Sequence, residues 1–191
     1  SDKMQILKML TRLRQLCLEP RLVYDNIDQP SSKLKACMEL IQTMQENKQK
    51  VLLFSSFTSA LDLIAEECQK AGITYYMLTG STNKEERREL VSRFQKDDTT
   101  LFLISLKAGG TGLNLTSAEN VIHYDPWWNV SAQNQATDRA YRIGQKSNVQ
   151  VFNLVMKDSV EEKIIEMQKR KKELADMFVE NNSGGLSQMS K

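Results

Sequence analysis

Residues that commonly form metal centres and disulfide frameworks are scarce in this sequence. The chain has one histidine, His123, and three cysteines, Cys17, Cys37 and Cys68. The cysteine count is odd, and no two cysteines have the Cys-x-x-Cys spacing of zinc and redox motifs. We therefore expect no metal site in the chain, and we expect the thiols to be reduced, as they are in intracellular proteins.

Long apolar runs and a strong excess of charge are also missing. No apolar run approaches the length of a membrane-spanning helix, and the first residues lack the apolar core of a signal peptide. The sequence therefore predicts a soluble intracellular chain without a membrane partner. Its 26 Lys and Arg against 24 Asp and Glu leave a net charge of +2. A nucleic-acid site would therefore have to be a local basic patch.

The sequence does contain a regular alternation of short apolar runs with helical segments. With 191 residues and 40% hydrophobic content, the chain can bury one full core, so one medium-sized domain is expected. The alternation favours an α/β fold in which helices cover both faces of a parallel sheet. The five expected strands are Val51–Phe54, Ile73–Leu78, Leu101–Ile104, Val121–Tyr124 and Val149–Val155.

Capping residues indicate where the helices begin and end. Ser59, Asn83 and Ser159 are each followed three residues later by an acidic residue, which is the spacing of a capping box. Ser31–Ser32 is expected to cap an earlier helix, and Gly72 to end the helix that starts near Ser59. The expected organisation is a helical lead-in at 1–48, the sheet domain at 49–157, a closing helix at 158–180 and a flexible tail at 181–191.

The ligand side of such a sheet lies beyond the carboxyl ends of its strands. One edge therefore collects most of the unusual residues of the chain, although no catalytic pair of carboxylates, no nucleophile–histidine arrangement and no metal set is visible among them. The four stretches expected at this edge are Ser55–Thr58, Thr79–Thr82, Leu106–Asn114 and Asp125–Asn129.

The third of these stretches is rich in glycine. Gly109, Gly110 and Gly112 would let backbone amides approach an anion closely, and Lys107 adds positive charge. The stretch matches neither the Gly-x-x-x-x-Gly-Lys-Ser/Thr loop nor the Gly-x-Gly-x-x-Gly fingerprint. A structural turn and an anion contact are both compatible with the pattern.

The fourth stretch holds both tryptophans of the chain, Trp127 and Trp128. Adjacent residues usually point to different sides, which favours one core and one exposed indole, although both could be packed as loop anchors. An exposed indole at this edge would suit contact with a sugar or a base. His123 precedes them in a buried strand, so we interpret it as structural.

A polar helical stripe follows in Gln135–Gln145. Gln135, Asp138, Arg139 and Arg142 share one face at helical spacing. Arginine suits anionic oxygen because its planar fork donates two hydrogen bonds and keeps its proton. The alternative is an ordinary solvated charged face.

Three segments in combination resemble one family: LLFSSFTSALD, LISLKAGGTGLNLTSAENVIHYDPWWN and QATDRAYRIGQ. They are similar to the SWI/SNF-type ATPases of helicase superfamily two, specifically to the second RecA-like lobe. The resemblance covers roughly Ser32–Glu180. It implies a motor that uses ATP with magnesium, bound mainly by a first RecA-like lobe of the same full-length protein, and that translocates on double-stranded DNA in the cytoplasm, nucleoid or nucleus.

The resemblance also implies roles for individual residues. The Walker A loop and the Asp-Glu box of the family are missing from this chain, so the chain alone is expected to be inactive. Val130 and Tyr141 depart from the usual family residues at positions that supply no phosphate contact. A strand-separating helicase and a degenerate lobe acting as an interaction scaffold are the alternatives. The implied arginine fingers are Arg139 and Arg142; the implied nucleotide contacts are Gln135, Asp138, Gly112 and Asn114; and the implied DNA contacts are Thr79, Gly80, Lys107, Gly109, Gly110 and Trp128.

Overall fold

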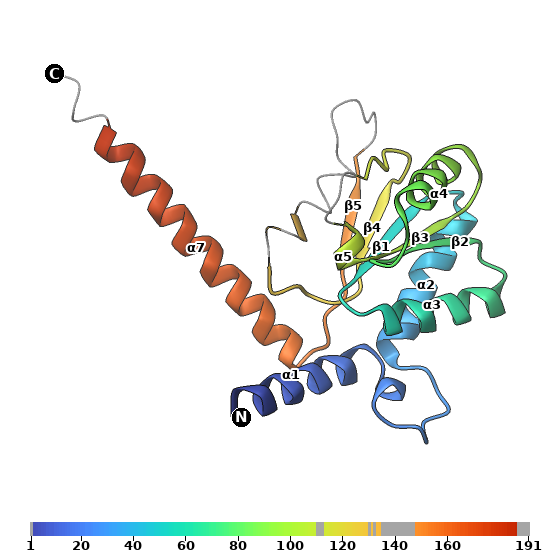
Figure 1. Cartoon of the computed structure of the whole chain (residues 1–191), viewed down its shortest axis with the longest axis horizontal. Coiled ribbons are helices and arrows are strands. Elements are labelled where there is room, and N and C mark those ends of the chain that lie inside the picture. The colour runs from blue at the N-terminus through green and yellow to red at the C-terminus, as the bar shows by residue number, and fades with distance from the viewer. Residues whose placement is uncertain (1, 110–112, 130, 132, 135–147, 187–191) are drawn as a thin grey trace.

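A five-stranded parallel sheet is the centre of the computed structural model of this chain (Figure 1). The structure describes residues 2–109, 113–129, 131, 133–134 and 148–186. Every pair of neighbouring strands is parallel, and the strand order is β2-β3-β1-β4-β5. The RecA-like α/β fold expected from the sequence is confirmed. The strands are β1 (Val51–Ser55), β2 (Tyr75–Leu78), β3 (Leu101–Ser105), β4 (Asn120–His123) and β5 (Gln150–Asn153).

Helices lie on both faces of the sheet, and the N-terminal helix lies below the sheet in the view of Figure 1. All five expected strands are present, although β2 and β5 are shorter than predicted, and β5 is a partly exposed edge strand. The described helices are α1 (Asp2–Leu18), α2 (Ser32–Glu46), α3 (Thr58–Ala71), α4 (Lys84–Lys96), the single turn α5 (Leu106–Gly109) and α7 (Val160–Leu186), with one 3-10 turn, η1 (Pro20–Leu22).

Several helix ends agree with the predicted caps. The Ser31 hydroxyl accepts a hydrogen bond from the Leu34 amide at 3.0 Å, and the Asn83 side chain accepts one from the Glu86 amide at 2.9 Å. Gly72 ends α3 in the left-handed region, with φ of 68°, a conformation that glycine adopts without a steric penalty. Local chemistry therefore determines these boundaries.

The predicted cap of α3 at Ser59 is wrong, although the helix begins near this residue as expected. Helix α3 begins at Thr58, and its N-cap is Phe57, which makes no side-chain cap bond. Ser59 consequently lies inside the first turn, where it is past the capping position. The end of β1 supplies the local hydrogen bond instead, because the Ser55 hydroxyl accepts from the Phe57 amide at 3.1 Å.

The last helix follows the prediction at its start and differs at its end. The Ser159 hydroxyl accepts from the Glu161 amide at 3.1 Å, as a cap should. The Glu162 carboxylate, however, accepts from the Asp158 amide at 3.0 Å, one residue before the cap. Helix α7 continues to Leu186, beyond residue 180, where the closing helix was expected to end.

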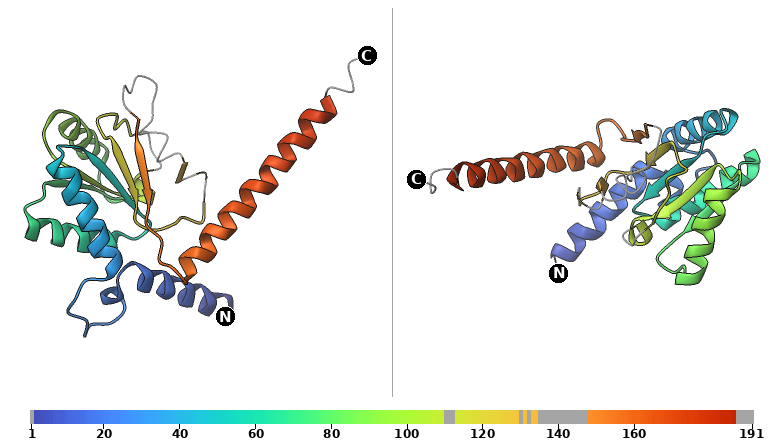
Figure 2. Two further views of the ribbon diagram at one scale, coloured as in Figure 1. Left: turned by 180° about the vertical axis from the view of Figure 1, so that it is seen from behind. Right: turned by 90° about the horizontal axis from the view of Figure 1, so that it is seen from above.

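The two faces of the sheet carry separate hydrophobic layers, and Figure 2 shows the helices that cover these faces. Because side chains alternate along a strand, Val51 and Leu53 of β1 pack with α2 and α3, whereas Leu52 and Phe54 pack on the other face with α4 and α5. Every residue of β1 and β3 is buried, which is the pattern of a parallel sheet covered on both sides.

The cysteines agree with the expectation of free thiols. All three are free, and Cys37 and Cys68 are buried between α2 and α3. Burial raises the pKa of Cys68 to about 12, and burial also raises the pKa of Cys37. Both thiols are therefore protonated near neutral pH and are poor nucleophiles.

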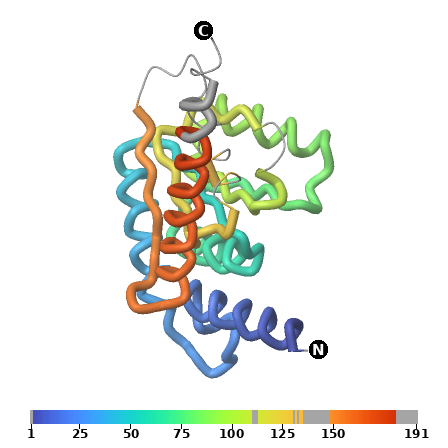
Figure 3. The backbone as a smooth tube through the Cα atoms, turned by 90° about the vertical axis from the view of Figure 1, so that its left-hand side faces the viewer, coloured from blue at the N-terminus to red at the C-terminus, as the bar shows by residue number. Residues whose placement is uncertain are grey.

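Helices α1 and α7 lie outside the two-layered core. Figure 3 shows α7 in front of the sheet, with its first turn near α1. The apolar positions of α1 are largely exposed, including Ile6 and Leu7 at 58% each. None of the helices in the described part of the chain combines the length and apolar character needed to cross a membrane.

A buried ion pair connects α2 to the start of α7. The Lys33 ammonium donates to both carboxylate oxygens of Glu161, at 2.6 and 2.8 Å, and to the Tyr124 carbonyl at 2.6 Å. Lys33 is 5% exposed and Glu161 is 1% exposed. The pair therefore joins the lead-in, the end of β4 and the closing helix.

Candidate functional site

Two of the expected contact loops pack side by side at the carboxyl edge of the sheet. A Cβ atom added to Gly80, after β2, would lie 3.4 Å from the Lys107 Cβ, after β3. Gly80 and Lys107 are both exposed. The close approach of the two segments places an ammonium group beside the exposed turn that follows Thr79.

The turn at Thr79 is held by its own side chains. The Thr79 amide donates to the Thr82 hydroxyl at 3.1 Å, and the Thr82 amide donates to the Thr79 carbonyl at 3.1 Å. The hydroxyls of Thr79 and Ser81 share a hydrogen bond of 2.8 Å. This turn therefore presents two hydroxyls and Gly80 at the edge.

The start of the glycine-rich stretch is a helical turn. Lys107 and Gly109 belong to α5, whose Ala108 amide donates to the Ser105 hydroxyl at 3.4 Å. Gly109 is buried, and a Cβ there would lie 3.4 Å from Cε1 of Phe54. The structure thus gives Gly109 a packing role under the turn, while Lys107 lies on the outer side.

Asp125 organises the other half of the edge. Its carboxylate accepts from the Ser55 hydroxyl at 2.6 Å, from the Ser56 amide at 3.1 Å and from the Ser56 hydroxyl. Asp125 is 1% exposed. These bonds join the end of β1 to the end of β4. Sequence reasoning placed Asp125 only within a loop, although a carboxylate directly after a buried strand was a usable signal.

Arg14 attaches the lead-in helix to this cluster. Its guanidinium donates to Asp125 and to the Pro126 carbonyl, both at 3.4 Å. It also lies 4.9 Å from the ring centre of Phe57 and 5.8 Å from that of Trp128, within the range of cation–π contacts. No sequence signal distinguished Arg14 from the other basic residues of α1.

One of the two tryptophans is buried and the other is exposed, which is one of the two arrangements that the sequence allowed. Trp127 is 1% exposed and packs edge-on against Phe54 and His123, with ring centres 6.0 and 5.5 Å apart. Trp128 is 36% exposed and lines a hollow of about 510 Å³ together with Lys171 and Lys172 of α7. An exposed indole therefore lies beside two basic side chains.

Helix α7 also contacts this loop directly. The Gln168 side-chain amide donates to the Trp127 carbonyl and, at 3.2 Å, to the Gln133 side chain. Because Arg14 belongs to α1 and Gln168 to α7, both of these helices contact the loop that carries Trp128. Neither contact was predicted, because each depends on residues far apart in the sequence.

We expect His123 to make the stability of the fold depend on pH. Burial lowers the pKa of His123 from 6.5 to about 4, so the folded chain keeps this ring neutral. The neutral His123 ring makes its full contribution to the free energy of unfolding above pH 6.5, and this contribution is lost as the pH falls from 6.5 towards 4. The free energy of unfolding decreases by about 3 kcal/mol over this range.

Urea unfolding at pH 7 and at pH 4 measures this loss. The His123→Gln variant is the control, because its side chain does not titrate while the carboxylates titrate in both proteins. Between the two pH values, the free energy of unfolding of the wild type should fall by about 3 kcal/mol more than that of the variant. Equal losses would contradict a buried neutral histidine.

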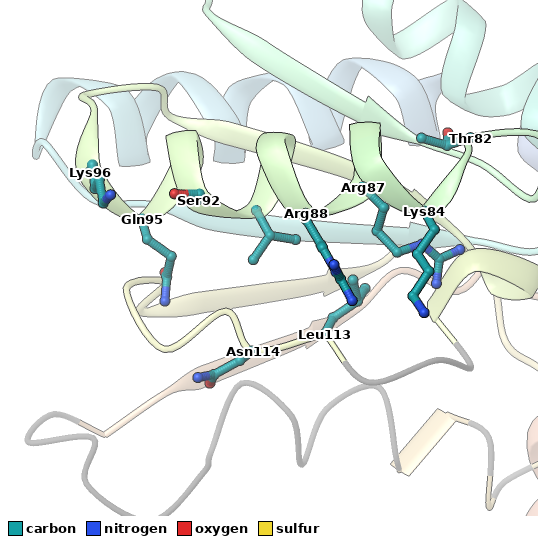
Figure 4. A pocket seen from close by; sticks show the side chains of 10 residues that line it. Thr82, Lys84, Arg87, Arg88, Ser92, Gln95, Lys96, Leu113 and Asn114 are labelled. Atoms are coloured by element: carbon teal, nitrogen blue, oxygen red, sulfur yellow. The ribbon is translucent and has the colours of Figure 1, made fainter.

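Several sequence-predicted site residues lie outside the described residues: Gly110, Gly112, Gln135, Asp138, Arg139 and Arg142. Asn114 is described, and it lines a hollow beside α4 (Figure 4).

The described residues do not fit a magnesium site. They contain no group of three or more His, Cys, Asp or Glu side chains that could hold a metal ion. The buried Asp125 carboxylate is already engaged by two serines and Arg14.

Comparison with known proteins identifies similar sequences and folds. The family model described as "Helicase conserved C-terminal domain" matches residues 32–144. The "Putative ATP-dependent helicase/translocase YwqA" of Bacillus subtilis is 40% identical over 188 residues, which are 95% of this chain and 20% of that protein. The mouse "SWI/SNF-related matrix-associated actin-dependent regulator of chromatin subfamily A member 1" is 37% identical over 192 residues, covering 94% of this chain and 18% of that protein.

Solved structures show the same fold at similar identity. The Sulfolobus solfataricus SWI2/SNF2 ATPase core in complex with double-stranded DNA superposes with a TM-score of 0.75 and 35% identity, over 88% of this chain and 36% of that one. The C-terminal part of the Fun30 ATPase domain superposes with a TM-score of 0.69 and 40% identity, over 72% of this chain and 45% of that one. The chain thus spans about a fifth of the curated relatives described above.

Proposed function

We propose that this chain, which belongs to the helicase conserved C-terminal domain family, is the second motor lobe of a SWI/SNF-type ATPase that translocates on double-stranded DNA. The proposal is carried by the exposed Lys107 beside the Thr79–Gly80 turn at the carboxyl edge of the sheet. Support comes from a similar ATPase core whose structure includes double-stranded DNA. In this assignment the edge contacts the DNA backbone, and Trp128 lies beside the duplex.

ATP and magnesium would be held mainly by the first lobe of the full-length protein. ATP supplies the driving force, because its binding favours closure of the two lobes and its hydrolysis releases them. Arg139 and Arg142 would stabilise the charge of the transferring phosphoryl group from the side of this chain, with Gln135 and Asp138 orienting them. Gly112 and Asn114 would connect that site to the DNA edge.

The structure suggests how the lobe transmits force. Arg14 of α1 and Gln168 of α7 both bind the Asp125–Asn129 loop. Movement of the lead-in helix would therefore be passed directly to the loop that carries Trp128. The strand-separating helicase and the interaction scaffold gain no specific support from the described residues. Strand displacement from a triplex, without unwinding of a duplex, would identify the full-length protein as a translocase.

DNA binding by this chain tests the edge assignment. Lys107→Ala is expected to reduce the steepness of log K against log salt concentration by about 0.9, the contribution of one phosphate contact. Lys107→Glu should weaken binding further, because it adds repulsion. Fluorescence anisotropy with a labelled 30-base-pair duplex at several salt concentrations measures both effects.

Lys70→Ala is the matched control for this experiment. Lys70 is an exposed lysine of α3, on the opposite face of the sheet, and pairs with Glu67 at 2.9 Å. Its loss should leave the salt dependence unchanged. The edge assignment fails if Lys107→Ala and Lys70→Ala bind duplex equally well.

A further inference from the structure

A basic groove runs beside α4 on the face of the sheet that also carries α5. It has a volume of about 820 Å³ and is bounded by α4 on one side and by Leu113 and Asn114 on the other (Figure 4). Four of its lining residues are basic, and none is acidic. These four, Lys84, Arg87, Arg88 and Lys96, define what we call the α4 groove.

Hydrogen bonds hold both walls of the α4 groove in place. Gln95 of α4 donates to the Thr116 hydroxyl at 3.2 Å and accepts from the Ser117 amide at 3.0 Å. At the other end, Arg87 donates to the Ala108 carbonyl at 3.4 Å. Leu113, on the wall opposite α4, is 3% exposed and belongs to the hydrophobic core.

Three of the four cations in the groove have no ion-pair partner among the described residues. Lys84, Arg88 and Lys96 are exposed, and none of them forms an ion pair with a described side chain. In Figure 4, Lys84 and Arg88 extend into the space between α4 and Leu113. Arg93, on the same helix, differs because it pairs with Glu89 at 2.5 Å and does not line the groove.

The position of the groove continues the edge that carries Lys107. Arg87 binds the carbonyl of the residue next to Lys107, and Thr82 at the start of the groove closes the Thr79 turn. From Lys84 to Lys96 the helix rises by about 18 Å. One strand of a duplex carries a phosphate about every 3.4 Å along the axis, so the row spans about five phosphates.

We propose that the α4 groove is a second binding surface for the phosphate backbone of double-stranded DNA, beyond the contact made at Lys107. This inference rests on the proposed function, because it extends the same DNA track along α4. The continuity with Lys107 and the three exposed cations Lys84, Arg88 and Lys96 favour a nucleic-acid backbone over an acidic peptide, which is the competing occupant.

The test uses the chain with the double substitution Arg88→Ala/Lys96→Ala. Loss of two phosphate contacts should reduce the steepness of log K against log salt concentration by about 1.8. If the plots of log K for the wild type and the double variant meet at 1 M salt, the affinity of the variant for a 30-base-pair duplex is roughly 60-fold lower at 0.1 M salt. Arg93→Ala, an alanine substitution on the same helix, should leave the slope unchanged. Circular dichroism confirms that each variant is folded.

The outcomes separate this inference from the proposed function. If Lys107→Ala weakens binding while Arg88→Ala/Lys96→Ala behaves like Arg93→Ala, the groove assignment is overturned and the edge assignment stands. If neither weakens binding, both fail. If the double variant binds duplex normally but loses binding of a polyglutamate peptide, the groove is a peptide site and its assignment to DNA is wrong.

Discussion

Replacing Arg142 with alanine in the full-length protein is expected to lower DNA-stimulated ATP hydrolysis by about three to five orders of magnitude, the contribution of arginine fingers in phosphoryl transfer. The guanidinium would donate to oxygens on which negative charge develops in the transition state, and alanine removes both the charge and the donors. Arg142→Lys should recover little activity, because a lysine keeps the charge but loses the bidentate fork.

Steady-state phosphate release with saturating duplex DNA measures this effect, and a fluorescent ATP analogue measures nucleotide affinity separately. A finger that acts in the transition state lowers kcat far more than it weakens binding. Arg93→Ala is the control, because Arg93 is an exposed arginine of α4 paired with Glu89 and has no assigned role. Unchanged hydrolysis in Arg142→Ala would refute the motor assignment.

Replacing Glu161 with alanine should destabilise the fold by about 3–5 kcal/mol, the cost of leaving one partner of a buried pair unpaired. The Lys33 ammonium would keep only the Tyr124 carbonyl, and the Met156 amide would lose its acceptor at 2.8 Å. Because this pair holds the start of α7 against α2, the closing helix should become more accessible to proteases as well.

Urea unfolding of the chain measures the change, with Glu166→Ala as the control. Glu166 forms an exposed pair with Lys163 at 3.5 Å, so its loss should cost less than about 0.5 kcal/mol. The combined variant Lys33→Met/Glu161→Leu should recover most of the stability, because two apolar residues leave no buried charge. Equal costs for Glu161→Ala and Glu166→Ala would show that the pair contributes nothing special.

The strands and most helix ends could be predicted because they depend on local patterns. An unbroken apolar run such as Val51–Phe54 is stable only where both faces are covered, and Asn83 caps α4 through an amide three residues away. The cap of α3 could not be predicted in the same way. The capping-box spacing at Ser59 was present, but the N-cap is Phe57, two residues earlier.

The candidate site was predictable in location and only partly in composition. The rule that ligands bind beyond the carboxyl ends of parallel strands placed Lys107, Gly80 and Trp128 at one edge. Arg14, Asp125 and Gln168 were missed as a group, because each acts through a partner in another element. The basic row of α4 was missed for a different reason, since it reads as an ordinary solvated helix face.

Two lysines show what the sequence alone determined and what only the tertiary structure decided. The sequence determined the number and direction of the strands and the burial of β1 and β3, because apolar runs and short connections allow few other arrangements. It could not show that Lys107 is exposed whereas Lys33 is buried. The partner of Lys33 is Glu161, 128 residues away, and a charge can be buried only when folding brings such a partner within hydrogen-bonding distance.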